Sequence, residues 1–120
     1  MDQFEQMLHD GTLSQSRPLL EAVVLLMPQN VKALFYLGLL ASEDGDLPKA
    51  RSLFTQATHA SEGDSRLQPN ALHMLAMVAL AQGDTAEARR ALKQAIGLNP
   101  DDDELMEQLQ SLQVQLSCAA

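Results

Sequence analysis

The residue types that most often bind metals or carry out catalysis are few in this sequence, and they lie far apart. The three histidines, His9, His59 and His73, fall in separate segments without the close spacing that metal ligands show. Cys118 is the single cysteine, so the chain can form neither an internal disulfide nor a zinc site built on cysteines. The sequence has no phosphate-binding glycine loop, nucleophile elbow or HExxH motif. We therefore predict no enzyme activity, no metal site and no cofactor.

Four consecutive acidic residues, Asp101 to Glu104, are the one cluster that resembles a cation site. Calcium loops alternate their ligands and turn on a glycine, whereas these acids are contiguous and no such loop follows. Acidic side chains are favoured at the start of a helix by the helix dipole. We interpret the cluster as the start of a helix over residues 103–117, with leucines on one side and glutamines on the other. This helix is predicted to cap the fold.

Charge and hydropathy exclude two classes of partner. Sixteen acidic residues against eight basic ones give a net charge of −8, which repels a phosphate backbone, so we predict no nucleic-acid binding. The longest apolar run, residues 33–41, is too short for a membrane span, so we predict no membrane insertion. The first residues lack the basic and apolar character of an export signal, which favours a cytoplasmic location. A periplasmic or complex-associated location stays open.

The elements that position these residues are predicted to be helices, arranged in repeats. Leucine and alanine dominate the composition, whereas the β-branched valine, isoleucine and threonine are scarce, which is typical of an all-α protein. Gly11, Gly45 and Gly83 each follow a helical pattern, at two intervals of similar length. Residues 34–60 align without a gap on residues 72–98. We predict a single domain over residues 1–120, with about seven helices and no strand.

Each repeat is predicted to be two helices joined by a tight turn. We place a truncated unit at residues 1–30, a full unit at 31–64 and a second full unit at 65–102. Asp46 and Asp84 are expected to cap the second helices, and Pro48 falls in a first turn, where its missing N–H costs nothing. Small residues on the second helices are expected to bring helices close together. They are Ala50, Ala57, Ala88 and Ala95.

The interval from Gly45 to Gly83 exceeds that from Gly11 to Gly45 by about one helical turn. We favour an extra turn at the start of the next helix, with Ser65 as its cap and residues 61–64 as linker. The alternative is a longer loop and a helix that starts at Pro69. In the truncated unit, apolar residues predict a short first helix and then line a second one. They are Phe4, Met7 and Leu8 in the first, and Leu19, Leu20, Val23, Val24 and Met27 in the second.

The pattern resembles that of the tetratricopeptide repeat (TPR) family, a helix–turn–helix of about 34 residues. In one unit the matching residues are Leu34, Leu37, Gly38, Gly45, Ala50, Phe54 and Ala57. In the next they are Leu72, Leu75, Ala76, Gly83, Ala88, Leu92, Ala95 and Pro100. The resemblance implies a right-handed α-solenoid of about three units, the first truncated, plus the C-terminal capping helix. It also implies a concave groove that binds a peptide or helix.

On the groove side, the first helices offer apolar residues with a few polar ones among them. The candidate partner-binding residues are Lys32, Phe35, Tyr36, Leu39, Ser42, Asn70, His73, Met74, Met77 and Leu80. The family's carboxylate clamp needs lysine, asparagine and arginine on successive first helices, and only Lys32 and Asn70 match it. We therefore do not expect a chaperone-tail adaptor. Methionines are typical of a surface that adapts to varied apolar ligands.

These observations favour a non-catalytic protein–protein interaction module, an adaptor or small chaperone, that holds an apolar or amphipathic segment of another protein. The alternative is a structural subunit that self-associates, for which a homodimer is one form. A regulatory module of a larger complex is a third interpretation. Five basic residues on the second helices are expected at the outer face, where they are solvated or dock an acidic partner. They are Lys49, Arg51, Arg89, Arg90 and Lys93.

Overall fold

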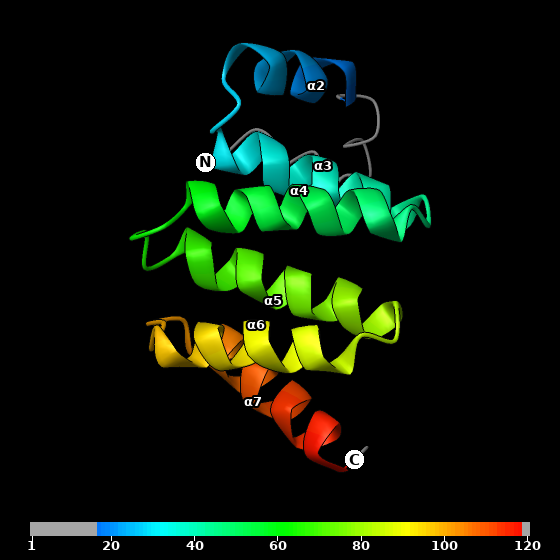
Figure 1. The fold of residues 1–120 in the computed structure, drawn as a ribbon. Coiled ribbons are helices and arrows are strands. Elements are labelled where there is room, and N and C mark those ends of the chain that lie inside the picture. The colour runs from blue at the N-terminus through cyan, green and yellow to red at the C-terminus, as the bar shows by residue number, and fades with distance from the viewer. Residues whose placement is uncertain (1–16, 119–120) are drawn as a thin grey trace.

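The computed structural model describes residues 17–118, and this part of the chain forms helices and no strand (Figure 1). The helices are α2 (Arg17–Leu26), α3 (Val31–Glu43), α4 (Leu47–Ala60), α5 (Leu67–Ala81), α6 (Thr85–Gly97) and α7 (Asp103–Cys118). The prediction of an all-helical chain is confirmed for these residues. The further helix predicted around Phe4, Met7 and Leu8 lies outside the described residues.

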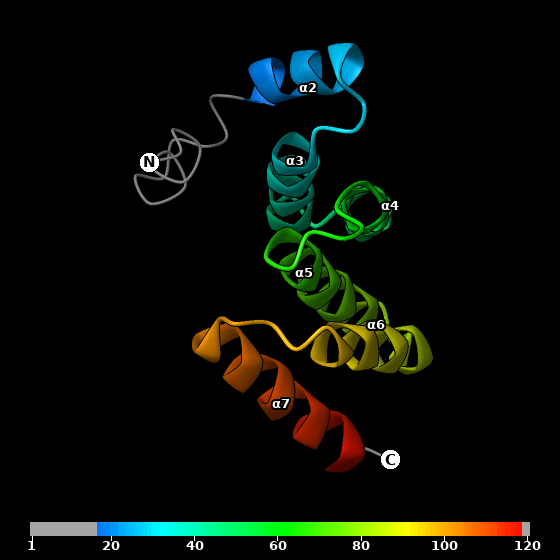
Figure 2. The ribbon, with the colours of Figure 1, turned by 90° about the vertical axis from the view of Figure 1, so that its left-hand side faces the viewer.

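The helices stack one after another, so that α2 and α7 lie at opposite ends of the array (Figure 1). Within it, α3 pairs with α4 and α5 with α6, and α4 also packs against α5 of the following pair. Figure 2 shows α4 and α6 on the side opposite to that of α3 and α7. We call α3, α5 and α7 the first helices and α4 and α6 the second helices. One continuous apolar core runs through the stack.

Tight turns of the same design join each first helix to its second helix. Gly45 and Gly83 adopt φ values of 80° and 81°, which glycine reaches without the clash that a Cβ would cause. The next residue then caps the helix that follows. Asp46 accepts the N–H of Lys49 at 3.2 Å, and Asp84 accepts that of Glu87 at 3.1 Å. Both predicted caps are confirmed.

The start of α5 lies between the two predicted alternatives. The helix begins at Leu67, after Ser65 and before Pro69. Asp64 takes the role predicted for Ser65, because its Oδ1 accepts the N–H groups of Arg66 (2.9 Å) and Leu67 (2.8 Å). Pro69 is accommodated in the first turn, where backbone N–H groups have no partner within the helix.

Small residues allow each first helix to approach its own second helix closely. A Cβ atom added to Gly38 would lie 2.7 Å from Cε1 and 2.8 Å from Cζ of Phe54. Ala50 and Ala88 are fully buried. The predicted close contact between these helices is therefore present in the structure.

The helix α2 differs from the prediction of a buried apolar stripe. Leu20 is fully buried, but Leu19 and Met27, predicted to line the same stripe, are 55% and 53% exposed. Leu25 and Leu26 are each 83% exposed. Among the described residues, α2 packs against α3, and this contact leaves Leu19 and Met27 largely exposed.

Candidate functional site

The ten residues predicted for the groove occupy equivalent positions in two neighbouring first helices. Each residue on α3 has a counterpart at the same repeat position on α5. The pairs are Lys32 with Asn70, Phe35 with His73, Tyr36 with Met74, Leu39 with Met77, and Ser42 with Leu80. Residues three and four apart share one face of a helix, so each set of five faces in one direction. We call the two sets together the concave strip, after the groove that the sequence predicts on this side of the repeats.

The residues of the concave strip differ in how far they reach the surface. Met77 is the most accessible large apolar side chain among them, at 44% exposed. Phe35, Leu39, Met74 and Leu80 are half-buried and pack against the core. The apolar side chains of the strip thus lie at the edge of the core, and Met77 is the one that extends furthest into solvent.

The first two aromatic residues of the strip are held by their neighbours. Tyr36 is 5% exposed and belongs to the core. The ring of Phe35 lies edge-on to the rings of Tyr36 and Phe54, with centroids 5.8 and 5.7 Å apart. Edge-to-face contacts of this kind fix the orientation of the rings. Phe35, which lines the cleft described below, is therefore held in a fixed orientation.

A cleft of about 830 Å³ lies where the N-terminal ends of α3, α5 and α7 come together. Four residues of the concave strip line it: Lys32, Phe35, Tyr36 and Asn70. The other six lie further along the helices. The remaining lining residues are Val31, Asp64, Arg66, Leu67, Asp102 and Glu104. The cleft therefore combines an apolar wall with charged groups of both signs.

Helix α7 contributes to the cleft as well, beyond the capping role predicted for it. Glu104 lines the cleft. It follows Asn70 by the same number of residues as Gly45 follows Gly11, so Glu104 occupies the equivalent position one repeat later. The sequence analysis missed Glu104 as a cleft residue, and this repeat interval is the sequence signal that could have identified it. Buried residues confirm the register, because three leucines of α7 follow three buried residues of α5 at the same offset. They are Leu105, Leu109 and Leu112, after Ala71, Leu75 and Val78.

The polar groups near the cleft are largely engaged within the protein. Asn70 donates its Nδ2–H to the carbonyl oxygen of Arg66 at 2.8 Å. The backbone N–H groups of Leu67 and Arg66 hold the pKa of Asp64 below its usual value. Burial lowers the pKa of the His73 imidazole.

Neither a metal centre nor a membrane span is found among residues 17–118. No three histidine, cysteine, aspartate or glutamate residues of this part gather closely enough to hold a metal ion. None of its helices has the length and apolar character needed to cross a bilayer.

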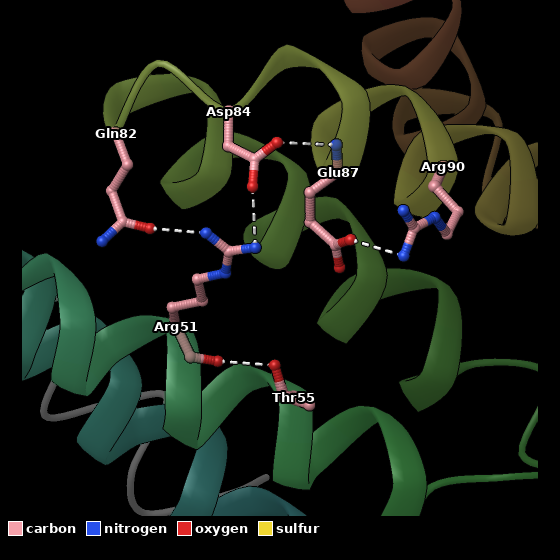
Figure 3. Close-up of polar contacts among 6 residues, drawn as sticks. All are labelled: Arg51, Thr55, Gln82, Asp84, Glu87 and Arg90. Carbon is pink, nitrogen blue, oxygen red and sulfur yellow. Dashed lines mark hydrogen bonds and ion pairs between the residues drawn. The ribbon is translucent and has the colours of Figure 1, made fainter.

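At the turn between α5 and α6, the side chain of Arg51 joins one unit to the next (Figure 3). Arg51 on α4 donates from Nη1 to Oε1 of Gln82 at 3.1 Å and from Nη2 to Oδ2 of Asp84 at 3.0 Å. Arg90 pairs with Glu87 one turn away at 2.9 Å. Asp84 thereby caps α6 and binds α4 at the same time.

The contact of Arg51 belongs to a series at equivalent positions. Arg17, at the same position of the preceding unit, pairs with Oδ2 of Asp44 at 2.8 Å, just after α3. Arg89, at the same position of the following unit, donates to the carbonyl oxygen of Leu116 at 3.0 Å, near the end of α7. Each arginine thus reaches forward to the C-terminal end of the next first helix. We call this line of contacts the arginine edge.

These contacts change the interpretation of the basic outer face. Three of its five predicted members, Arg51, Arg89 and Arg90, are engaged within the protein. Lys49 and Lys93 are exposed. The carboxylates of Asp84 and Glu87 offset the charges of Arg51 and Arg90, so the face is less basic than the sequence suggests, whereas the carbonyl partner of Arg89 carries no charge.

Comparison with known proteins agrees with the fold. A family model described as a tetratricopeptide repeat matches residues 33–101, which is more than half of the chain and runs from α3 to just before α7. A search of curated proteins gave no significant match. The turns, the small residues and the equivalent arginines are features of the same repeat. The chain belongs to the tetratricopeptide repeat family.

Proposed function

We propose that this chain is a non-catalytic module that binds an apolar or amphipathic segment of a partner protein along the concave strip, as an adaptor or small chaperone. TPR repeats generally mediate protein–protein interactions, and domains of this kind are typically not catalytic. One observation supports the proposal that the ligand is apolar or amphipathic. Apolar side chains of the strip remain partly at the surface on both α3 and α5, namely Phe35 and Leu39 on α3 and Met74 and Met77 on α5.

The properties of these residues suit an apolar ligand. Phe35 supplies a fixed ring, whereas the unbranched methionines adapt their shape to different side chains. The cleft at the end of the strip adds charged groups, which orient a ligand without contributing most of the affinity. An amphipathic helix, with apolar residues three and four apart, matches a strip that runs across two helices.

Met77→Glu is the variant that tests this proposal. Met77 is 44% exposed, so a carboxylate there remains hydrated in the free protein. A bound apolar segment would strip the water from this charge without offering a partner, which costs several kcal/mol. We expect Met77→Glu to lose the partners that the wild-type protein captures from its native host, as measured by pull-down and mass spectrometry. Its melting temperature should remain close to that of the wild type.

Gln94→Glu is the matched control, because Gln94 is exposed on α6, a second helix, and the substitution adds the same charge. It should retain every partner. Capture of the same partners by Met77→Glu at full strength would show that binding occurs elsewhere. Unfolding of Met77→Glu would show that the strip is only core. Leu39 is a poorer test site because it is half-buried and packs against the core.

A further inference from the structure

The helix α2 and the residue that follows it carry an apolar surface that is separate from the concave strip. Its members are Leu19 (55% exposed), Leu25 (83%), Leu26 (83%) and Met27 (53%), and we call them the α2 face. They are four of the seven large apolar side chains that are exposed in the described part of the chain. The opposite side of α2 buries Leu20 against the core. A helix that is apolar nearly all round requires cover on a second side.

The residues of α4 and its C-terminal cap that are equivalent to Leu19 and Met27 show how strongly these positions are buried in a later repeat. Leu53 and Ser61 correspond to Leu19 and Met27, and they are only 8% and 2% exposed. The equivalent contacts of Arg17 and Arg51 fix this correspondence. Leu19 and Met27 thus occupy positions that are packed in the later repeat but open in α2, whereas the counterparts of Leu25 and Leu26, His59 and Ala60, are exposed and half-buried.

The other end of the array is closed by polar side chains. Gln110 and Gln113 of α7 correspond to Ala76 and Ala79 of α5, which are small and buried. Both glutamines are exposed. Because α7 does not offer an apolar surface there, it is a poor cover for the α2 face of another copy. Head-to-tail growth is therefore disfavoured, whereas pairing of like surfaces remains.

We propose that two copies of this chain form a dimer by packing their α2 faces together about a twofold axis. Charge favours this surface. Residues 17–27 contain one basic and one acidic residue, Arg17 and Glu21, and have no net charge in a chain whose net charge is −8. Two copies repel each other least where they approach through a neutral surface. The proposal concerns a surface outside the concave strip and goes beyond the proposed function.

The size of the α2 face fits a reversible dimer. At about 30 Å² of accessible apolar surface per side-chain carbon, the exposed parts of the four side chains amount to about 330 Å² in each copy. Two copies would bury about 660 Å² of apolar surface, and apolar atoms make up roughly two thirds of a homodimer interface. The whole interface then reaches about 1,000 Å², which is the lower limit for specific association.

The test measures the mass of the full-length protein by light scattering and sedimentation over a wide range of concentration. We expect the mass of the wild type to rise from 13.1 kDa toward twice that value. Leu26→Glu and Leu26→Lys should each remain monomeric. An equimolar mixture of these two variants should form dimers again, because the two copies then carry opposite instead of like charges in the interface. Melting curves are compared at a dilution at which the wild type is monomeric, and there the three proteins should agree.

Val114→Glu provides the control, because Val114 is 62% exposed on α7, far along the chain from the α2 face. It should dimerise as the wild type does. A wild type that is monomeric at all concentrations overturns the proposal. So does a dimer that persists in Leu26→Glu or dissociates in Val114→Glu, since its interface then lies elsewhere. A lower melting temperature of Leu26→Glu with no change in mass also overturns it, because the protein's own chain then covers the face.

Discussion

Adding a single methyl group at Gly38 tests the close packing between a first and a second helix. The Cβ atom of Gly38→Ala would lie 2.7 and 2.8 Å from two ring carbons of Phe54, closer than Cβ contacts in real structures. The ring is not free to move away, since Phe54 is fully buried and stands edge-on to Phe35. The substitution therefore forces helix α3 and helix α4 apart or bends the side chain out of its rotamer.

Two opposing effects determine the magnitude. Overpacking of a core costs about 1–3 kcal/mol, whereas replacing a glycine in a helix by alanine gains up to about 1 kcal/mol. A mid-range overpacking cost of about 2 kcal/mol, less the helix gain of about 1 kcal/mol, should therefore lower the free energy of unfolding by about 1 kcal/mol. For a domain of this size, the melting temperature drops by about 4 °C.

Thermal unfolding followed by far-ultraviolet circular dichroism measures this change. Gly97→Ala is the matched control: Gly97 lies in α6, and no heavy atom is found within 4 Å of its added Cβ. It should keep the melting temperature or raise it. The reasoning is refuted if Gly38→Ala stabilises the protein as much as Gly97→Ala does.

A second substitution tests whether the ring of Phe54 is the cause. The following repeat has Ala76 and Leu92 at the positions of Gly38 and Phe54. The double variant Gly38→Ala/Phe54→Leu thus copies a pair that already packs in this fold. Its loss of stability should be smaller than the sum of the two single losses by about 0.5–3 kcal/mol, as contacting residues show. Additive losses would assign the strain to another neighbour.

Two further predictions concern the other helices. Ala50→Leu forces a bulky side chain into a fully buried site and should lower the melting temperature clearly, whereas Gln94→Leu at an exposed site should not; equal melting temperatures would contradict the assigned register. For Asp84, hydrogen bonds from the Glu87 N–H and from Arg51 hold the carboxyl pKa below its usual value. The ionised Asp84 therefore stabilises the fold fully at a pH above that usual value, and this stabilisation is lost as the pH falls through the folded-state pKa. Urea midpoints of the wild type should therefore fall more steeply below about pH 4 than those of Asp84→Asn, and parallel pH profiles of the two proteins would refute this assignment.

The sequence predicts those parts of the fold that depend on local chemistry. Gly45 and Asp46 determine a turn and a cap through their own backbone conformation and side chain, so both are predictable without a neighbour. The start of α5 was harder to predict because Asp64 and Ser65 are adjacent capping residues, and the carboxylate of Asp64 accepts two N–H groups. Periodicity also places the ten candidate groove residues on two helix faces.

Contacts between units were beyond the reach of the sequence. Arg51 meets Gln82 and Asp84 across the boundary between two units, through a long side chain whose direction is set only by packing. The exposure of Leu19 also depends on packing, namely on which helix lies beside α2. The sequence alone does not distinguish Leu19 from a leucine that is buried. Tyr36 was assigned to the groove face; it lines the cleft, but it is only 5% exposed and packs in the core, which the helical spacing alone does not reveal.

The arginine edge has a mechanical consequence for the cleft. The edge joins neighbouring units at the C-terminal ends of the first helices, and the cleft opens at the N-terminal ends of the same helices. A first helix such as α3 is a lever about 20 Å long, so that a rotation of roughly 5° about the edge moves its far end by about 2 Å. The two ion pairs on this edge are partly exposed and weaken with salt. We therefore expect high salt to weaken the joints between units at the end of the first helices opposite the cleft, and so to let the width of the cleft vary.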